Sequence, residues 1–283
     1  MKKQTIISLN PAHNYKVIGQ VPVSSHAEID LKIAQAHKAA FSWAQRELDE
    51  RIAVLEKLYT AFKTRKNEIR AISSQEMGMP ISVADIVDFE FGLNYMRGYL
   101  DNAQQWLSPE IVFKNNDETH YLYFEPKGVA AVSVPWNFPF LMFVWGAVQN
   151  LIAGNTVVFK HSEECPLTGK LLEEITDSIN LPEGVFNAVY GDGSDVGDYL
   201  MNGDINFIYF TGSTNVGRHL YQTAARKLIP IMLELGGSAP GIVFEDAAID
   251  EAVESIYLFR YLNSGQSCDA LKRLIVHETI FDD

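Results

Sequence analysis

The second half of the sequence alternates short apolar runs with amphipathic stretches, and this pattern restricts the fold more than any other feature. The apolar runs cover Val129–Val134, Thr156–Phe159, Val185–Val189, Phe207–Tyr209 and Ile229–Leu233. Helical stretches lie between them, near residues 138–152, 166–179, 194–202 and 214–226. Strands that alternate with helices predict βαβ units. The expected fold class is therefore α/β, with a parallel sheet flanked by helices on both faces.

The first hundred residues have the apolar spacing of helices. Three helices are predicted there, at residues 27–45, at about 49–78 with Asp49 as the N-cap, and from about Val83 past Tyr99. The beginning of the chain is thus expected to be mostly helical.

Two further segments have short-strand patterns. Residues 115–127 alternate and include several aromatic side chains, which predicts a hairpin or an extension. Beyond the last run, Gly241–Phe244 and Leu274–Val276 flank a helix predicted from Ala247 to about Arg260. This order predicts a second short strand–helix–strand unit.

The charge of the chain limits its partners. Acidic residues exceed basic ones by 36 to 23, which gives a formal net charge of −13. Such a surface repels phosphate backbones, so nucleic acid is not expected as a partner. The apolar segment at residues 138–153 contains Pro139, Gln149 and Asn150 and is too short for a membrane span. A buried helix is predicted instead, and no membrane partner.

The reactive residue types exclude two further classes of protein. Two cysteines are too few for a disulfide scaffold, and the seven histidines are scattered without metal-ligand spacing, so no metal site is predicted. The beginning of the sequence lacks the apolar stretch of a secretory signal, and a cytoplasmic location is expected.

Ligands of parallel sheets bind where strands end and loops turn into helices. After the first predicted strand, Asn137 lies between Pro135 and Pro139. Its amide offers uncharged N–H donors suited to an oxyanion; the alternative is an asparagine that satisfies its own turn. After the second strand, Lys160 and Glu163 either pair on the surface or grip a diol such as a ribose.

Glycine-containing turns follow the next two strands. Residues 191–197 resemble the dinucleotide-binding fingerprint but have three residues, not two, between the second and third glycines. In residues 210–217, Gly-Ser-Thr leads into a helix whose free N–H groups can hold a pyrophosphate. The alternative is that Ser213 or Thr214 is a plain N-cap that needs no ligand.

Glu234 and Cys268 are the reactive side chains of the last loops. Glu234 lies between leucines, where a buried carboxylate would lose hydration and become a general base near neutral pH. The alternative is a glutamate that faces solvent where the strand ends. Cys268 follows a polar, glycine-containing loop that can expose it and favour the thiolate, whereas Cys165 is expected to be an inert core residue.

Taken together, these motifs resemble the aldehyde dehydrogenase superfamily, whose members oxidise aldehydes with NAD(P) through a cysteine thioester. The motifs that carry the resemblance are PWNFP at 135–139, GNTVVFK-x-x-E at 154–163, FTGSTNVG at 210–217, LELGG at 233–237 and GQSC at 265–268. They occur in the family's order and extend over essentially the whole chain.

The resemblance implies three catalytic residues. Cys268 is the implied nucleophile, whose thiolate attacks the aldehyde carbonyl, and the Asn137 amide and the Cys268 backbone N–H would hold the oxyanion. A hydride then passes to the nicotinamide and leaves a thioester. Glu234 would activate the water that releases the carboxylic acid.

The resemblance also implies a set of cofactor contacts. These are Trp136 and Lys160 on the adenosine side, Glu163 on the ribose hydroxyls, Gly193 and Phe210 in the glycine-containing turns, Gly212 and Ser213 at the pyrophosphate, and Leu235 and Gly236 beside the nicotinamide. A carboxylate at Glu163 would repel a 2′-phosphate, so NAD is favoured over NADP.

Members of this family continue well past the cysteine. We therefore expect a Rossmann-like NAD-binding domain at residues 1–235, with an oligomerisation hairpin near 117–127, and the truncated start of a second α/β catalytic domain at 236–283. Two alternatives to an active aldehyde dehydrogenase stay open: an inactive remnant that binds NAD, and one part of a split enzyme. The expected partners are an aldehyde and either a second copy of the chain or a complementing C-terminal fragment, and no residue selects the aldehyde.

Overall fold

The computed structural model describes residues 4–282 and is built on one five-stranded parallel sheet. In spatial order its strands are β7 (Phe186–Val189), β6 (Thr156–Lys160), β5 (Val129–Ser133), β8 (Phe207–Gly212) and β9 (Ile231–Leu235). The five apolar runs are thus confirmed as strands, although β8 and β9 extend further toward their loops than predicted. The α/β class is confirmed as well.

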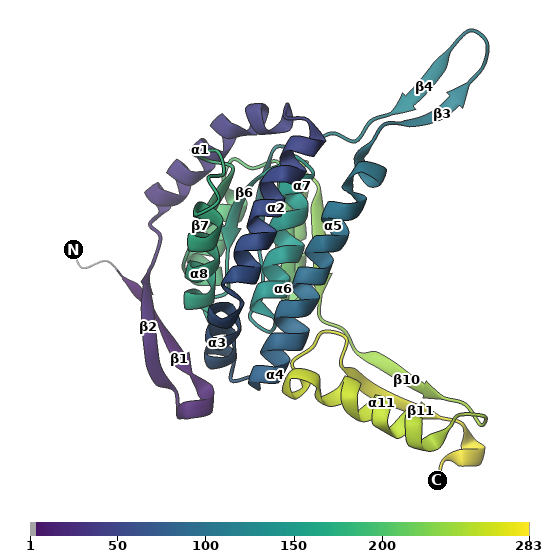
Figure 1. The fold of residues 1–283 in the computed structure, drawn as a ribbon. Helices are drawn as coiled ribbons and strands as arrows, with labels where there is room; N and C mark the ends of the chain where they lie inside the picture. Colours follow the sequence, from purple (N-terminus) through teal and green to yellow (C-terminus); the bar gives the residue numbers. More distant parts are fainter. Residues whose placement is uncertain (1–3, 283) are drawn as a thin grey trace.

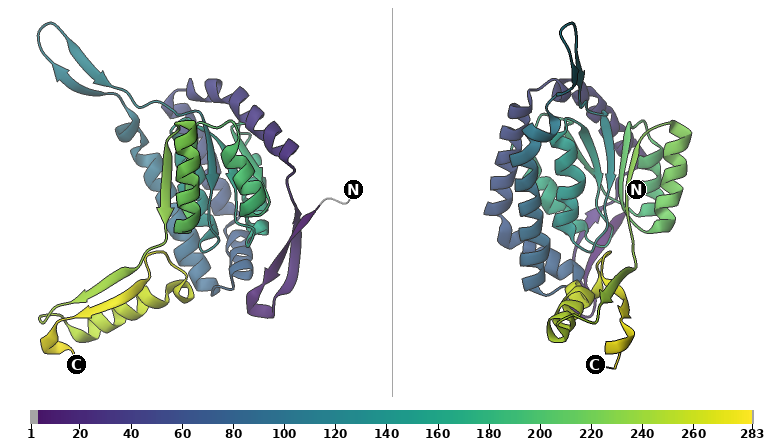
Figure 2. Two further views of the ribbon diagram at one scale, coloured as in Figure 1. Left: turned by 180° about the vertical axis from the view of Figure 1, so that it is seen from behind. Right: turned by 90° about the vertical axis from the view of Figure 1, so that its right-hand side faces the viewer.

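Helices cover both faces of the sheet (Figures 1 and 2), and its inner strands are buried on both faces, whereas the edge strand β9 is half-buried to exposed. Along β5, Ala130 and Val132 enter one hydrophobic core, whereas Val129 and Ala131 enter the other, as the alternation of side chains in a strand requires. The first core includes α2 (Leu48–Thr64), α5 (Phe91–Leu107) and α8 (Pro166–Asp177), and the second includes α1 (His26–Ala44), α9 (Asp198–Asn202) and α10 (Thr214–Lys227).

The apolar segment after β5 is a helix inside the first core, as predicted. It consists of α6 (Pro139–Phe143), a π-helical turn (Val144–Val148) and α7 (Gln149–Ile152), and most of its side chains are buried. Within residues 4–282, no helix is long and apolar enough to cross a bilayer.

The first hundred residues are mostly helical, as predicted, but the chain begins with two strands that were not predicted. Strands β1 (Thr5–Asn10) and β2 (Lys16–Pro22) form an antiparallel hairpin. The buried carboxylate of Glu76 joins this hairpin to the body: it accepts hydrogen bonds from the Ser8 hydroxyl at 2.6 Å and from Thr168 through both its N–H (2.8 Å) and its hydroxyl (2.7 Å). Because these hydrogen-bond partners lie far apart in the chain, the spacing of apolar residues within the first segment did not reveal the hairpin.

The second predicted helix is two helices. Helix α2 begins at Leu48 with Glu47 at the cap position, so the assignment of Asp49 as N-cap is wrong; Asp49 lies in the first turn, where its charge complements the helix dipole. The chain bends at Arg65, whose guanidinium binds Glu68 at 2.6 Å, and continues as α3 (Lys66–Met77). The next helical stretch comprises α4 (Ile81–Val83), a π-helical turn (Ala84–Glu90) and α5.

Two elements project from the body (Figures 1 and 2). One is the hairpin of β3 (Glu110–Lys114) and β4 (Thr119–Leu122). It lies earlier in the chain than residues 115–127, because Asn115 makes the turn: its side-chain oxygen accepts the N–H groups of Asp117 and Glu118 at 2.8 and 2.9 Å.

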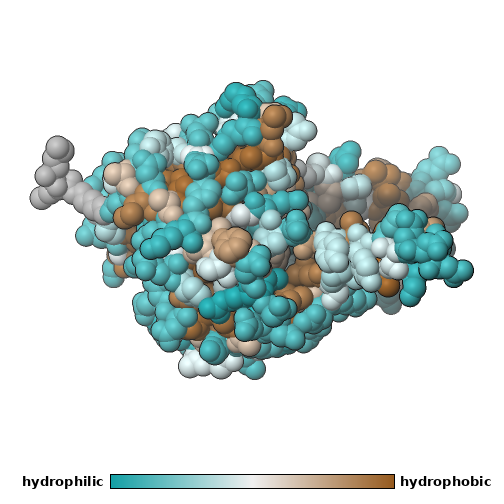
Figure 3. Space-filling view, turned by 90° about the horizontal axis from the view of Figure 1, so that it is seen from above, coloured by the Kyte–Doolittle hydropathy of each residue, from teal (hydrophilic) through white to brown (hydrophobic). Residues whose placement is uncertain are grey.

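The other projection is the predicted strand–helix–strand unit. It consists of β10 (Ala239–Val243), α11 (Ile249–Tyr261) and β11 (Leu271–Val276), with β10 and β11 paired in parallel. The molecular face in Figure 3 is largely hydrophilic with separate apolar patches, but both projections expose large apolar side chains. Examples are Ile111, Val112 and Tyr121 on the hairpin and Phe244, Leu258 and Ile275 on the unit.

Asp88, in the π-helical turn Ala84–Glu90 that precedes α5, caps the buried helix α6. Its fully buried carboxylate accepts the N–H groups of Phe140 and Leu141, each at 3.0 Å. Burial raises the pKa of Asp88 to about 7, although these two N–H groups favour the ionised form. Because the folded pKa exceeds that of the unfolded chain, stability that is present below about pH 4 is lost as the pH rises through about 7.

We predict that Asp88→Asn removes this pH dependence. Between pH 4.5 and 7.5, the unfolding free energy of the wild-type chain should fall relative to that of the variant by up to about 1.4 kcal/mol per pH unit. Urea denaturation at a series of pH values measures the difference. Asp85→Asn is the control, because Lys66 holds the pKa of Asp85 below its ordinary value, outside this range. A constant difference between wild type and Asp88→Asn would contradict the prediction.

Candidate active site

The order of the strands places one crevice at the carboxyl ends of the strands of the sheet. Chain order runs outward from β5 through β6 to β7 on one side, and through β8 to β9 on the other. Loops that leave the carboxyl ends of β5 and β8 therefore diverge, and ligands of open α/β sheets bind at such a point. A cavity of about 520 Å³ lies there, lined by Trp136 and Asn137 after β5 and by Gly212 and Ser213 after β8.

This cavity brings together most of the predicted site residues. Those that line it are Trp136, Asn137, Gly212, Ser213, Glu234, Leu235, Gly236 and Cys268. The other wall is aromatic and apolar and was not predicted as part of a site; it includes Tyr95, Phe138, Met142 and Trp145. A signal existed in the sequence, because residues 138, 142 and 145 follow Asn137 at the spacing of one helix face.

Asn137 contacts the cysteine loop instead of its own turn. Its Nδ2 donates to the carbonyl of Gln266 at 2.9 Å, and its own carbonyl accepts from Nδ2 of Asn263 at 2.7 Å. The alternative of a turn asparagine that satisfies only its own loop is therefore wrong. One N–H of the Asn137 amide is used by Gln266, and the amide has a second N–H to offer.

The end of the Asn137 loop is fixed from two sides. Asp88 caps α6 directly after it, and His161 Nε2 lies 3.3 Å from the carbonyl of Pro139. Burial lowers the pKa of His161 to about 4, so the ring is neutral near pH 7 and can donate from Nε2 while its Nδ1 accepts from the N–H of Ser162 at 3.0 Å. The loop that carries Asn137 is thus held by buried groups.

The two cysteines differ as expected. Cys165 is fully buried in a small core with Met77 and Met79, and burial raises the pKa of its thiol well above the ordinary value. Cys268 is exposed and lines the cavity. Cys268 is therefore the candidate nucleophile, because its thiol is accessible and shares the cavity with the Asn137 amide.

Glu234 is exposed at the end of the edge strand β9, where it pairs in register with Thr211 of β8. The structure therefore supports the solvent-facing alternative, not a buried carboxylate. Glu234 nevertheless lines the cavity, so its carboxylate can reach both bound molecules and water.

Three predicted cofactor residues form a second group. Lys160 is 2% exposed and its Nζ donates to Glu163 Oε2 at 3.0 Å, so the pair is present but the lysine is not on the surface. Glu163 Oε1 also accepts the N–H of Gly193 at 3.2 Å. Burial alone would raise the pKa of Glu163, but the Lys160 cation and hydrogen bonds to the carboxylate, including the one from the Gly193 N–H, together hold that pKa below its ordinary value.

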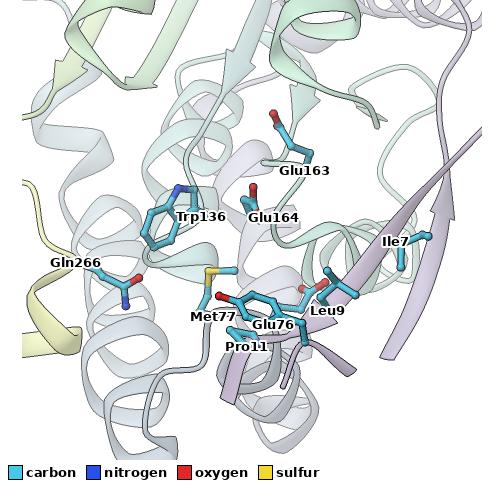
Figure 4. A pocket seen from close by; sticks show the side chains of 10 residues that line it. Ile7, Leu9, Pro11, Glu76, Met77, Trp136, Glu163, Glu164 and Gln266 are labelled. Carbon is cyan, nitrogen blue, oxygen red and sulfur yellow. The ribbon is translucent and has the colours of Figure 1, made fainter. Parts of the chain in front are cut away.

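A smaller cavity of about 310 Å³ joins the two groups. Trp136 and Gln266 line both cavities. Figure 4 shows these two side chains on one side of the smaller cavity, Glu163 and Glu164 beyond them, and Ile7 of the N-terminal hairpin on the opposite side. The Lys160–Glu163 pair and the cysteine loop therefore share one continuous edge of the molecule.

The turn after β8 is built from close backbone contacts. Ser213 is the N-cap of α10 and accepts the N–H of Val216 at 3.3 Å, so the plain-cap interpretation accounts for its hydroxyl. Phe210 is 7% exposed, and a Cβ on Gly212 would lie 2.5 Å from its ring. Phe210 thus shapes the turn from within the core and does not line the large cavity.

These residues fit a dinucleotide. The N-terminus of α10 can receive a pyrophosphate, and the Lys160–Glu163 pair offers a donor and an acceptor to a ribose diol. A Cβ on Gly236 would have no atom within 4 Å, which leaves open space at the backbone beside Leu235. Within residues 4–282, no cluster of three or more His, Cys, Asp or Glu side chains is placed to hold a metal ion.

We predict that iodoacetamide modifies Cys268 and leaves Cys165 unmodified in the folded chain. The reason is that Cys268 is exposed, whereas Cys165 is 0% exposed. Peptide mass mapping after brief labelling measures both sites, and labelling in urea provides the control in which both react. Equal modification of the two thiols in the native chain would contradict the prediction.

Comparison with known proteins gives one family. The family model described as "Aldehyde dehydrogenase family" matches residues 1–283. The 2-hydroxymuconic semialdehyde dehydrogenase of Pseudomonas sp. (strain CF600) is 35% identical over an alignment of 287 positions that covers 99% of this chain and 59% of that protein. D-Glyceraldehyde dehydrogenase (NADP(+)) of Picrophilus torridus is 32% identical, over 99% of this chain and 57% of that protein.

The solved structures agree. PnpE in complex with nicotinamide adenine dinucleotide superimposes with a TM-score of 0.92 at 34% identity, over 99% of this chain and 57% of that one. The chain thus spans somewhat more than half the length of the relatives that it matches. Because the family model covers every residue and the fold agrees, the chain belongs to the aldehyde dehydrogenase family.

Proposed function

We propose that this chain supports the NAD-dependent oxidation of an aldehyde to a carboxylic acid through a thioester on Cys268. The observation that carries the proposal is the composition of one cavity. An exposed thiol, an amide donor and a carboxylate line it together with the turn at the N-terminus of α10. These are the groups that the reaction needs, and they come from loops far apart in the sequence.

The first step is attack by Cys268. The thiolate forms an S–C bond to the aldehyde carbonyl, and the π electrons of the carbonyl move to its oxygen. Asn137 would donate the N–H that Gln266 does not use to this oxyanion, and the Cys268 backbone N–H would donate a second hydrogen bond. The buried supports of the Asn137 loop keep the donor in place without reorganisation.

Glu234 serves the later step. When NAD is bound it supplies the acceptor for the hydride that leaves the same carbon. Glu234 then takes a proton from water, whose oxygen attacks the thioester carbonyl; the S–C bond breaks, and the thiol and the carboxylic acid are formed. An exposed carboxylate on the wall of the cavity suits this role, because water must reach it.

The cofactor preference rests on Glu163. Its carboxylate is held ionised by Lys160 and Gly193, in a position to accept from ribose hydroxyls and to repel a 2′-phosphate. The named relatives include both a structure with bound NAD and an NADP(+) enzyme. We propose NAD on the ground of this carboxylate.

We further propose that residues 1–235 act as the NAD-binding domain and that residues 236–283 begin the catalytic domain. The apolar side chains exposed on the hairpin support assembly with a second copy of the chain. Those exposed on the β10–α11–β11 unit support a complementing C-terminal segment, since α11 buries none of its side chains.

One observation favours a second candidate function, the binding of NAD without turnover. The Lys160, Glu163 and Gly193 group belongs to loops that follow strands of the central sheet, whereas Cys268 lies beside the exposed unit. The adenosine side of NAD could therefore be bound by residues that make no direct hydrogen bond with Cys268.

We predict that the 283-residue chain forms NADH when it is mixed with NAD and a panel of aldehydes, and that Cys268→Ala abolishes this activity. Absorbance of NADH gives the rate, and Cys165→Ala is the matched control because that thiol is buried. Turnover that survives Cys268→Ala would contradict the thioester mechanism. An NAD-dependent rise in melting temperature without NADH would support the second candidate instead.

We predict that Glu163→Gln narrows the preference for NAD over NADP by tenfold or more. The substitution removes the negative charge that faces the 2′ position and leaves the Lys160 cation free to pair with a phosphate. Melting temperatures measured over a range of NAD and NADP concentrations give both dissociation constants. Glu164→Gln, a neighbouring carboxylate in the smaller cavity, is the control. An unchanged ratio of the two constants would exclude Glu163 as the discriminating group.

A further inference from the structure

The loop before Cys268 has an unusual backbone. Asn263, Ser264 and Gly265 follow one another in the left-handed region, with φ values of 49°, 58° and 79°. Asparagine tolerates this conformation better than most residues, but three in a row are unfavourable unless the surroundings hold them. The cause of that restraint must therefore lie in contacts of the loop.

A reciprocal pair of hydrogen bonds supplies the restraint. The amide of Asn137 donates to the carbonyl of Gln266, and the amide of Asn263 donates to the carbonyl of Asn137. Each side chain thus binds the backbone of the other loop, over sequence separations of 129 and 126 residues. Asn263 is 1% exposed, so its hydrogen bond is shielded from water.

The orientation of both amides is determined by their partners. A carbonyl can only accept, so the NH₂ group of each asparagine must face it. The side-chain oxygens of both residues are buried and have no hydrogen-bond partner in the part of the chain that the structure describes. No acceptor interaction therefore competes with the two donor interactions for the orientation of these amides.

The same pair connects two parts of the molecule. Among residues 4–282, the hydrogen bonds between residues 236–282 and the rest of the chain are these two. The covalent link from β9 and the walls of the cavity complete the connection. Asn137 and Asn263 therefore supply the hydrogen bonds that restrain the position of Cys268 relative to the sheet.

We propose that Asn263 is a positioning residue that locks the Cys268 loop onto the Asn137 loop, so that the thiol faces the amide that stabilises the oxyanion. Asn263 acts through its side-chain N–H, not merely through its tolerance of a left-handed backbone. The inference rests on the proposed roles of Cys268 and Asn137, and it adds the group that brings them into register.

Two reactions of the thiol separate position from exposure. In the first, the thiolate attacks the carbonyl of p-nitrophenyl acetate; the S–C bond forms, the bond between the acyl carbon and the aryloxy oxygen breaks, and p-nitrophenolate leaves with the electron pair. This acylation passes through an oxyanion, which needs the aligned Asn137 donor. In the second, iodoacetamide alkylates sulfur by displacing iodide, a step that creates no oxyanion and requires only an accessible thiol.

The test compares both rates in variants of the complete chain. Asn263→Gly and Asn263→Asp both accept a left-handed backbone but lack the NH₂ donor. We expect each to acylate at least tenfold more slowly than wild type while its alkylation rate changes by less than about threefold. Ser264→Gly is the matched control, because it alters the adjacent left-handed, exposed residue without touching the amide pair; both of its rates should equal those of wild type.

A double variant tests whether the two asparagines act together. We expect Asn137→Ala combined with Asn263→Gly to acylate no more slowly than Asn137→Ala alone, because without the donor the position of the thiol no longer matters. Cys165 reports folding in every sample, since it becomes alkylated only when the core opens.

The outcomes distinguish a failure of the positioning role of Asn263 from a failure of the proposed role of Cys268. Wild-type acylation in both Asn263 variants, or a parallel loss of acylation and alkylation, would overturn the positioning role. Acylation that persists in Cys268→Ala would instead overturn the proposed function, because Cys268 would not be the nucleophile. A variant in which Cys165 reacts is unfolded. If one of Asn263→Asp and Asn263→Gly is unfolded by this criterion, the rates of the other variant decide the outcome.

Discussion

Burial of the central parallel sheet on both faces is the constraint on which the rest of the structure depends. A parallel sheet needs a covering layer on each side, and every crossover returns the chain to the same edge before the next strand begins. The loops that follow β5, β6, β7, β8 and β9 therefore gather at one edge. Because the order reverses between β5 and β8, two of these loops diverge, and the larger cavity lies between them.

The sequence predicted the sheet well for the same physical reason. A strand buried on both faces contains few polar residues, so β5 and β6 stand out as apolar runs, and the chemistry-bearing residues follow directly after them. The rule that ligands bind at strand ends then selected Asn137, Lys160 and the turn at Gly212. The large cavity and the Lys160–Glu163 pair show that these positions share one edge, whereas the roles proposed for them rest on chemistry and on the family.

Features that depend on contacts between residues far apart in the chain, or on the position of a strand at the side of the sheet, could not be predicted from the sequence. The N-terminal hairpin is fixed by Glu76, far along the chain, and local spacing does not reveal such a partner. Glu234 lies between leucines, yet β9 is an edge strand whose side chains alternate between half-buried and exposed. The link between Asn137 and Asn263 joins two loops with no common motif, so neither the burial of Asn263 nor its partner was predictable.

The position of β9 in the chain has a consequence for the order in which the site is made. The sheet receives its last strand at Leu235, and Cys268 is synthesised after it. Since domains fold as units during synthesis, with N-terminal ones first, the part of the crevice that is formed by the loops of the sheet can fold while the thiol is still inside the ribosome. The loop that carries the cysteine then folds against a surface that has already formed, and Asn137 on that surface is its hydrogen-bond partner.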